Sequence, residues 1–120
     1  MKKKYYITTP IYYPSAKPHM GHAYSSISAD FIARYKRLEG YDVMFVTGTD
    51  EHGQKIQKSA DKRKLSPDIF CNEISKVFLD LTKTLNLSNT DFIRTTEIRH
   101  HKTVQKLWNI LEEKKFIYLS

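Results

Sequence analysis

The sequence predicts a layered α/β domain with a mainly parallel sheet and flanking helices. Short apolar runs rich in aromatic and β-branched residues, typical of buried strands, recur along the 120 residues. Longer segments between them carry apolar residues at spacings of three and four, as amphipathic helices do. The two kinds of segment alternate. In such folds, ligands bind beyond the carboxyl ends of the strands.

Residues 5–40 predict the first strand and the first helix. Tyr5 to Tyr13 is rich in aromatic and β-branched residues and is stopped by Pro14, so we expect a buried strand there. A loop follows, and from His22 onward apolar residues recur at helical spacing until Gly40 ends the helix. These apolar residues are Tyr24, Ile27, Phe31, Tyr35 and Leu38.

The middle of the chain predicts a second strand and two helices. Val43 to Val46 is a short apolar run that suits a strand buried on both faces, and the polar turn GTDEHG follows it. Gln54 to Lys64 is polar and predicted to be helical. Ser66 supplies an N-cap for the next helix, with Pro67 in its first turn. The apolar stripe of that helix is Phe70, Ile74, Val77, Phe78, Leu81 and Leu85.

The last third predicts one strand, one helix and the start of a fourth strand. The third strand lies around Phe92 and Ile93. The final run, KFIYLS, is apolar and strand-like, and an unpaired edge strand there would be prone to aggregation. We therefore expect the sequence to be the front portion of a larger architecture. The helical spacing between these two strands is carried by Ile98, Val104, Leu107, Trp108 and Leu111.

Composition and charge narrow the classes of protein. Hydrophobic residues make up 40% of the chain and aromatic residues 12%, as in an ordinary globular protein rather than a disordered one. Twenty Lys and Arg against thirteen Asp and Glu leave a formal charge of +7 at pH 7. This charge favours polyanionic partners such as nucleic acid or nucleotide phosphates, although a solvated basic surface is the more ordinary explanation.

Cysteine content and hydropathy exclude other classes. Cys71, the single cysteine, cannot form a disulfide framework or a zinc site of several cysteines, and it fits a reducing cytoplasm. We expect Cys71 to be a small buried residue. No apolar run reaches the ~18 residues of a membrane span, and no secretion signal is recognisable. The sequence therefore predicts a soluble, cytoplasmic protein without a membrane partner, and it specifies no oligomeric state.

Two histidines mark the start of the first helix. His19 and His22 flank Gly21 in HMGH, directly after a strand and a loop. The unpaired N–H groups and the dipole of a helix N-terminus favour anions, phosphate above all. Both imidazoles can donate to phosphate oxygens, and the glycine lets a flat base approach the backbone. The fitting chemistry is attack on the α-phosphate of ATP, with the histidines as electrostatic clamps.

A second polar turn follows the second strand. Asp50, in GTDEHG, offers a carboxylate for an ammonium group of a ligand. Two alternatives stay open: Asp50 bonds its own turn backbone, and the histidines are a surface pair or an incomplete metal site. Position favours the binding hypothesis, because both turns follow strands, where a parallel sheet of this type places its ligand site.

These motifs carry a family resemblance. The sequence closely resembles the N-terminal catalytic domain of methionyl-tRNA synthetases, which are class I aminoacyl-tRNA synthetases, most strongly over Tyr5 to Gln57. HMGH looks like the class I HIGH signature with Met20 in place of isoleucine, and PIYY and GTDEHG narrow the class to the methionine enzyme. The resemblance implies the first half of a Rossmann-like, HUP-type nucleotide-binding domain.

The resemblance also implies a reaction. His19 and His22 would contact the ATP phosphates and stabilise the transition state of adenylate formation, while Gly21 would pack beneath adenine. Methionine attacks ATP to give methionyl-adenylate and pyrophosphate, with Mg²⁺ assisting. The acyl group then passes to tRNA(Met) for translation in the cytoplasm.

For methionine, the resemblance implies three binding residues. Ile11, through its backbone carbonyl, and Asp50, through its carboxylate, would hold the α-amino group. Tyr13 would form one wall of the pocket around the thioether, which suits an amphipathic aromatic ring. Glu51 and His52 belong to the motif and receive no role.

Parts of the family pattern are missing. KIQKS, from Lys55 to Ser59, resembles the second signature, KMSKS, but it directly follows GTDEHG, so we interpret it as a solvated helix face. The KMSKS loop, the connective insertion and the anticodon-binding domain are absent. We therefore expect residues 1–120 to be the N-terminal half of the catalytic domain, without a zinc site and with little or no activity alone.

Two other functions fit parts of the sequence. A small nucleotidyltransferase also uses H-x-G-H at a helix start, although PIYY and GTDEHG fit an amino acid pocket better. A non-catalytic RNA-binding or protein-association module would use the basic surface instead. Its candidate contacts to RNA phosphates are Arg94, Arg99, His100, His101 and Lys102.

Overall fold

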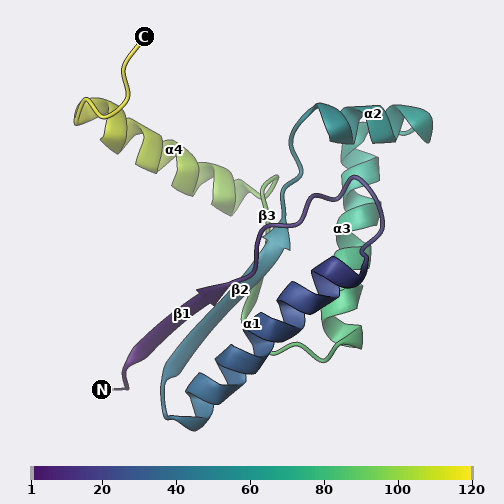
Figure 1. The fold of residues 1–120 in the computed structure, drawn as a ribbon. Coiled ribbons are helices and arrows are strands. Elements are labelled where there is room, and N and C mark those ends of the chain that lie inside the picture. The colour runs from purple at the N-terminus through teal and green to yellow at the C-terminus, as the bar shows by residue number, and fades with distance from the viewer. Residues whose placement is uncertain (1, 120) are drawn as a thin grey trace.

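The computed structural model describes residues 2–119 and has the predicted α/β architecture. Figure 1 shows the strands side by side, with helices in the crossovers. The strands are parallel and lie in the order β1-β2-β3. The elements are β1 (Lys4–Thr8), α1 (Met20–Leu38), β2 (Asp42–Thr49), α2 (Gln54–Lys62), α3 (Pro67–Thr84), β3 (Asp91–Arg94) and α4 (Ile98–Glu113).

The strand register brings the carboxyl ends of β2 and β3 together. Thr49, the last residue of β2, pairs with Arg94, the last residue of β3. One residue earlier, the two backbones approach so closely that a Cβ atom on Gly48 would overlap the carbonyl oxygen of Ile93. The turn after β2 therefore emerges beside the end of β3.

Helices α1 and α3 lie beside the sheet in Figure 1, and the core lies between helices and strands. Val43 and Phe45 of β2 pack against Ala29 and Ala33 of α1. Cys71 is 3% exposed, which confirms that it is a small buried residue. It belongs to a second buried cluster, which joins α2, α3 and the loop after β1: Tyr12, Ile56, Ala60, Phe70, Cys71, Ile74 and Phe78.

The sheet-facing side of α1 consists of small and polar residues. The predicted apolar stripe instead forms the other side of the helix, where Phe31 is 72% exposed and Leu38 is 87% exposed. Small side chains let a helix approach a sheet closely, which a row of aromatic rings would prevent. Periodicity thus predicted the helix correctly but not the side that packs. The buried residues of α1 are Ser26, Ala29, Asp30 and Ala33.

A buried carboxylate ties α1 to the segment before β3. Asp30 Oδ1 accepts hydrogen bonds from the backbone N–H and the hydroxyl of Ser88, both at 2.6 Å. Its Oδ2 accepts from Arg34 Nε at 2.6 Å. Burial raises the pKa of Asp30, but the hydrogen bonds from Ser88 and Arg34 outweigh burial, so the net shift of the pKa is downward.

The first strand is shorter than predicted. β1 ends at Thr8, whereas the predicted strand ran to Tyr13. Pro10 has no N–H to donate to the ladder, so strand pairing is interrupted there. Tyr12 then rejoins β2 through an isolated bridge to Thr49.

The predicted fourth strand is wrong as far as the structure describes the segment. Residues 116–119 form no strand, and Ser120 lies outside the described residues. Figure 1 shows α4 projecting away from the sheet, and no residue of this helix is buried. The segment that follows α4 therefore lies far from any strand edge with which it could pair.

Candidate active site

The loops after β1 and β2 lie side by side at the carboxyl edge of the sheet. The Tyr12 N–H donates to the carbonyl oxygen of Gly48 at 3.0 Å, and the Asp50 N–H donates to that of Tyr12 at 2.8 Å. Ile11 and Tyr13 flank Tyr12 in the chain. The structure therefore brings the three predicted methionine-binding residues onto two adjoining loops.

Tyr13 is fastened to the turn after β2. Its hydroxyl donates to the carbonyl oxygen of His52 at 2.5 Å. Gly53 lies against the hydroxyl with a φ of +111°, a backbone conformation that favours glycine, and a Cβ atom there would force the hydroxyl to move. Tyr13 is 38% exposed and Ile11 is 53% exposed, so both offer accessible surface to a ligand.

The two histidines cap α1 reciprocally. His19 is the N-cap residue, and its Nδ1 accepts a hydrogen bond from the Gly21 N–H at 3.1 Å. His22 Nδ1 accepts from the His19 N–H, also at 3.1 Å. The ring centroids lie 4.0 Å apart. Both rings are thus held at the start of the helix, where the sequence placed them.

This capping fixes the tautomer of each neutral ring. Because Nδ1 accepts a backbone N–H in both histidines, the ring proton must lie on Nε2. Burial lowers the pKa of His22, and the neighbouring His19 lowers it further. His22 is therefore neutral at pH 7, and its Nε2–H is a donor suited to a phosphate oxygen.

Tyr12 joins the histidines to the two loops. Its ring stacks on Phe78 with centroids 5.6 Å apart and meets the His22 ring edge-on at 5.1 Å. Its hydroxyl lies 2.5 Å from Ser26 Oγ, and the side chain is 5% exposed. Sequence analysis missed this residue, because the aromatic run IYY does not reveal which ring faces inward.

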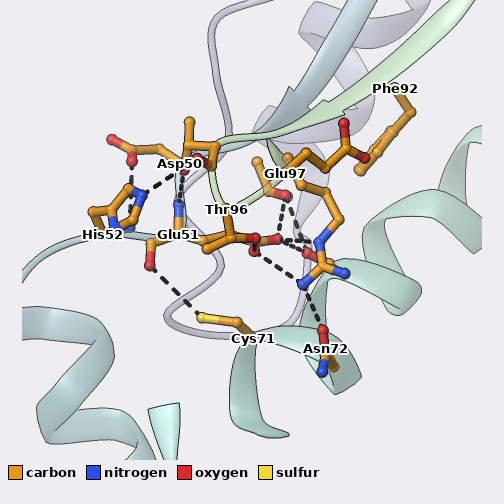
Figure 2. Close-up of polar contacts among 12 residues, drawn as sticks. Asp50, Glu51, His52, Cys71, Asn72, Phe92, Thr96 and Glu97 are labelled. Atoms are coloured by element: carbon orange, nitrogen blue, oxygen red, sulfur yellow. Dashed lines mark hydrogen bonds and ion pairs between the residues drawn. The ribbon is translucent and has the colours of Figure 1, made fainter. Parts of the chain in front are cut away.

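The turn after β2 sends neighbouring side chains in opposite directions. Figure 2 shows Asp50 and His52 on one side of the turn, with Thr96 and Asn72 on the other. Asp50 is half-buried and His52 is exposed, whereas the side chain of Glu51 is 0% exposed. Glu51 was given no role from the sequence, yet it anchors the turn.

An ion pair holds Glu51 in the interior. Arg94 Nε donates to Oε1 at 2.7 Å, and Arg94 Nη2 donates to Oε2 at 2.9 Å. Burial raises the pKa of Glu51, but hydrogen bonds from Arg94, Ser75, Thr96 and Thr49 outweigh burial and leave the pKa below its usual range. The register pair of Thr49 with Arg94 is the signal that could have found this contact, because adjacent parallel strands end together.

Two of the basic residues considered for RNA contacts are engaged within the protein. Arg94 is bound to Glu51, and Arg99 donates to both carboxylate oxygens of Asp91 at 2.6 and 2.9 Å. These ion pairs count against a surface of free cations at this position. On α2, Lys55, Gln57 and Lys58 of KIQKS are exposed, as expected for a solvated helix face, whereas Ile56 faces inward and is buried.

Within residues 2–119, no group of three or more His, Cys, Asp or Glu side chains is placed to hold a metal ion. No helix in this part of the chain combines the length and the hydropathy that crossing a membrane requires.

Replacement of His22 by glutamine is expected to reduce the acid sensitivity of the α1 N-terminus. The pKa of folded His22 lies below 6.5. The stability that the neutral ring contributes to the fold is therefore complete above about pH 6.5 and is lost as the pH falls through the folded pKa. Glutamine at this position also accepts from the N-cap N–H but does not titrate. The free energy of unfolding is measured with urea at about pH 7.5 and pH 5. Between these two pH values it should fall by up to about 1 kcal/mol more in the wild type than in the variant. Equal losses would contradict the prediction.

Comparison with known proteins identifies the family. A sequence profile described as tRNA synthetases class I (M) matches residues 5–120. The chain belongs to this family. It is 56% identical over 119 residues to the methionine–tRNA ligase of Listeria monocytogenes and 53% identical over 119 residues to that of Ureaplasma parvum. These alignments cover 99% of the chain but 18% and 23% of the relatives, so the chain spans about a fifth of their length.

A solved class I tRNA synthetase (M) shares the fold. The structure of Mycobacterium tuberculosis methionyl-tRNA synthetase bound by methionyl-adenylate superposes with a TM-score of 0.90 and 46% identity. The match covers 92% of this chain and 22% of that chain. The predicted family and the predicted fold class are therefore confirmed.

Proposed function

We propose that the chain is the first part of the catalytic domain of a methionine–tRNA ligase. The observation that carries this proposal is the position of Tyr12, which packs against His22 and hydrogen-bonds both Gly48 and Asp50. One residue thereby fixes the candidate ATP site relative to the candidate methionine site. The relatives named methionine–tRNA ligase, and the neighbour bound by methionyl-adenylate, support the same function.

In this proposal, the start of α1 binds ATP. The Nε2–H groups of His19 and His22 donate to phosphate oxygens, and both stabilise the charge that builds up on the phosphoryl group. Gly21, between them, is exposed and has no side chain, so the adenine ring can lie against its backbone. The helix dipole adds to the attraction for the phosphates.

The adjoining loops bind methionine. The Asp50 carboxylate and the Ile11 carbonyl oxygen accept hydrogen bonds from the α-ammonium group, and the Tyr13 ring packs against the thioether. The methionine carboxylate oxygen then attacks the α-phosphorus of ATP, and the bond to the β-phosphate bridging oxygen breaks as pyrophosphate leaves. In a second step, a hydroxyl of the 3′-terminal adenosine of tRNA(Met) attacks the carbonyl carbon of the adenylate, and the methionyl group is transferred as AMP leaves, for translation in the cytoplasm.

Magnesium is the counter-ion usual for such ATP chemistry, but the residues described here do not form its site. Mg²⁺ prefers oxygen ligands, whereas the start of α1 presents imidazole nitrogens. We therefore assign Mg²⁺ to no residue of this chain. We further propose that residues 1–120 are the N-terminal half of the catalytic domain and that the remaining half supplies the rest of the ATP site.

A chimeric enzyme tests this proposal directly. The chain replaces the aligned segment of the L. monocytogenes ligase, and methionine-dependent exchange of labelled pyrophosphate into ATP is measured. We expect the chimera to be active, His19→Ala or His22→Ala to lower exchange about a hundredfold, and Asp50→Asn to raise KM for methionine. The 120-residue chain alone is assayed beside it and should show little exchange.

The matched control is the double variant Lys55→Ala, Lys58→Ala on exposed α2, which should leave exchange unchanged. A folded chimera without exchange would show that the proposed function is wrong. Exchange that survives loss of both histidines would show that the ATP site lies elsewhere.

A further inference from the structure

Glu51 has a structural position that its neighbours lack. Asp50 and His52, on either side of it, reach the surface, while its own carboxylate is fully buried. A carboxylate taken out of water is stable only when its oxygens are paired. Here Oε1 accepts from Thr49 Oγ1 at 2.9 Å and from Ser75 Oγ, and Oε2 accepts from Thr96 Oγ1.

The donors come from three separate parts of the chain. Arg94 lies at the end of β3, Ser75 lies on α3, and Thr96 lies in the turn before α4. Arg94 is itself held in place, because its Nη2 also donates to Asn72 Oδ1 at 2.7 Å. The Glu51 carboxylate therefore joins the turn after β2 to α3, to the end of β3 and to the turn before α4.

The backbone of Glu51 is fixed as well. Its N–H donates to Thr95 Oγ1 at 2.8 Å, and its carbonyl oxygen lies 3.8 Å from Cys71 Sγ. The Thr95 N–H donates to the Thr49 carbonyl oxygen at 3.1 Å, which extends the pairing of the two strands beyond their ends. The φ and ψ angles of this residue are thus restrained from both sides.

Asp50 depends on this restraint. Within residues 2–119, its carboxylate accepts one hydrogen bond, a long one of 3.4 Å from the His52 N–H. The direction of its side chain is therefore set by the backbone, which Tyr12 fixes on one side and Glu51 on the other. Figure 2 shows the two carboxylate-bearing residues adjacent, with Thr96 on the Glu51 side of the turn.

We propose that Glu51 is a positioning residue: bound by Arg94 in the interior, it holds the turn so that the neighbouring Asp50 faces an ammonium group of the substrate. The assignment of that ammonium group to methionine rests on the proposed function. The restraint of Asp50 by Glu51 does not depend on the proposed function.

Hydrogen exchange of the 120-residue chain tests the positioning without any ligand. In Glu51→Gln, the amide NH₂ must face guanidinium or hydroxyl donors, so the turn should loosen. We expect the protection of the Tyr12 and Asp50 N–H groups to fall at least about tenfold, while the Thr9 N–H, bonded to Val46 in the strand ladder, keeps its protection.

Asp30→Asn is the matched control, because Asp30 is likewise a buried carboxylate bonded by hydroxyl, N–H and guanidinium groups. It should reduce protection at Ser88 and leave Asp50 unchanged. Unchanged protection at Asp50 in Glu51→Gln, or an equal loss at every amide, would overturn the proposal.

Kinetics of the chimeric ligase then test the link to the substrate. Glu51→Gln should raise KM for methionine about tenfold, as should Asp50→Asn, through loss of a charge-assisted hydrogen bond. The inhibition constant of the desamino analogue 4-(methylthio)butanoate, which lacks the ammonium group, should stay within about twofold. Equal weakening of both ligands would show a merely structural role. An inactive parent chimera would instead refute the proposed function, while hydrogen exchange would still decide the positioning.

Discussion

Gly48→Ala is expected to destabilise the chain by about 3 kcal/mol or more. Its Cβ atom would overlap the backbone carbonyl oxygen of Ile93, with the carbonyl carbon and amide nitrogen of the same residue also close. A backbone atom in a paired strand cannot rotate away as a side chain can, so β3 must separate from β2. The free energy of unfolding is measured by urea denaturation with circular dichroism.

Gly40→Ala supplies the control for this substitution. Gly40 follows α1 with a φ of +88°, and an added Cβ atom would meet no atom within 4 Å. Only the left-handed backbone opposes alanine there, at a cost of about 1 kcal/mol. If Gly48→Ala were no more destabilising than Gly40→Ala, the close approach of β2 and β3 would be contradicted.

Helices were predicted well because their signals are local. Ser66 and Pro67 placed the start of α3 correctly, and the Ser66 hydroxyl accepts a hydrogen bond from the Ile69 N–H. Burial was harder to predict. In α1, the large apolar residues are exposed and Ala29 and Ala33 face β2, so the helical period was clear while the packed side depended on the distance between helix and sheet.

The site shows the same division between local and distant information. His19, His22 and Asp50 were predicted as polar residues that follow strands, and the structure places them at the start of α1 and in the turn after β2. The burial of Glu51 was not predicted, because three consecutive polar residues do not reveal which one turns inward, and its partner Arg94 lies 43 residues away. Only the register of β2 with β3 brings the two together.

Arg94→Met should lower the free energy of unfolding by about 3 kcal/mol at neutral pH. Removal of one partner leaves the buried Glu51 carboxylate without its counter-charge, which typically costs about 3–5 kcal/mol. We expect the lower end of this range, because Arg94 is 28% exposed and water can reach part of the vacated space. Urea unfolding at about pH 7 and pH 4 measures the change.

The pH dependence identifies Glu51 as the cause. In the wild type, the pKa of Glu51 is held below 4.5. The stability that the paired carboxylate contributes to the fold is therefore present above about pH 4.5 and is lost as the pH falls through the folded pKa. Without Arg94, the effect of burial should dominate and raise the folded pKa above the unfolded value. The variant then binds a proton more readily when folded than when unfolded. Its loss of unfolding free energy relative to the wild type should therefore be full near pH 7 and much smaller near pH 4.

Arg63→Met separates this effect from the general loss of a cation. Arg63 Nη2 lies 2.6 Å from Glu73 Oε2, but the two side chains are 46% and 48% exposed. An exposed pair contributes at most about 1 kcal/mol, so this variant should change little at either pH. A deficit in Arg94→Met that is equal at both pH values would show that Glu51 is not the group left unpaired, because a carboxylate that is protonated near pH 4 no longer needs a counter-charge.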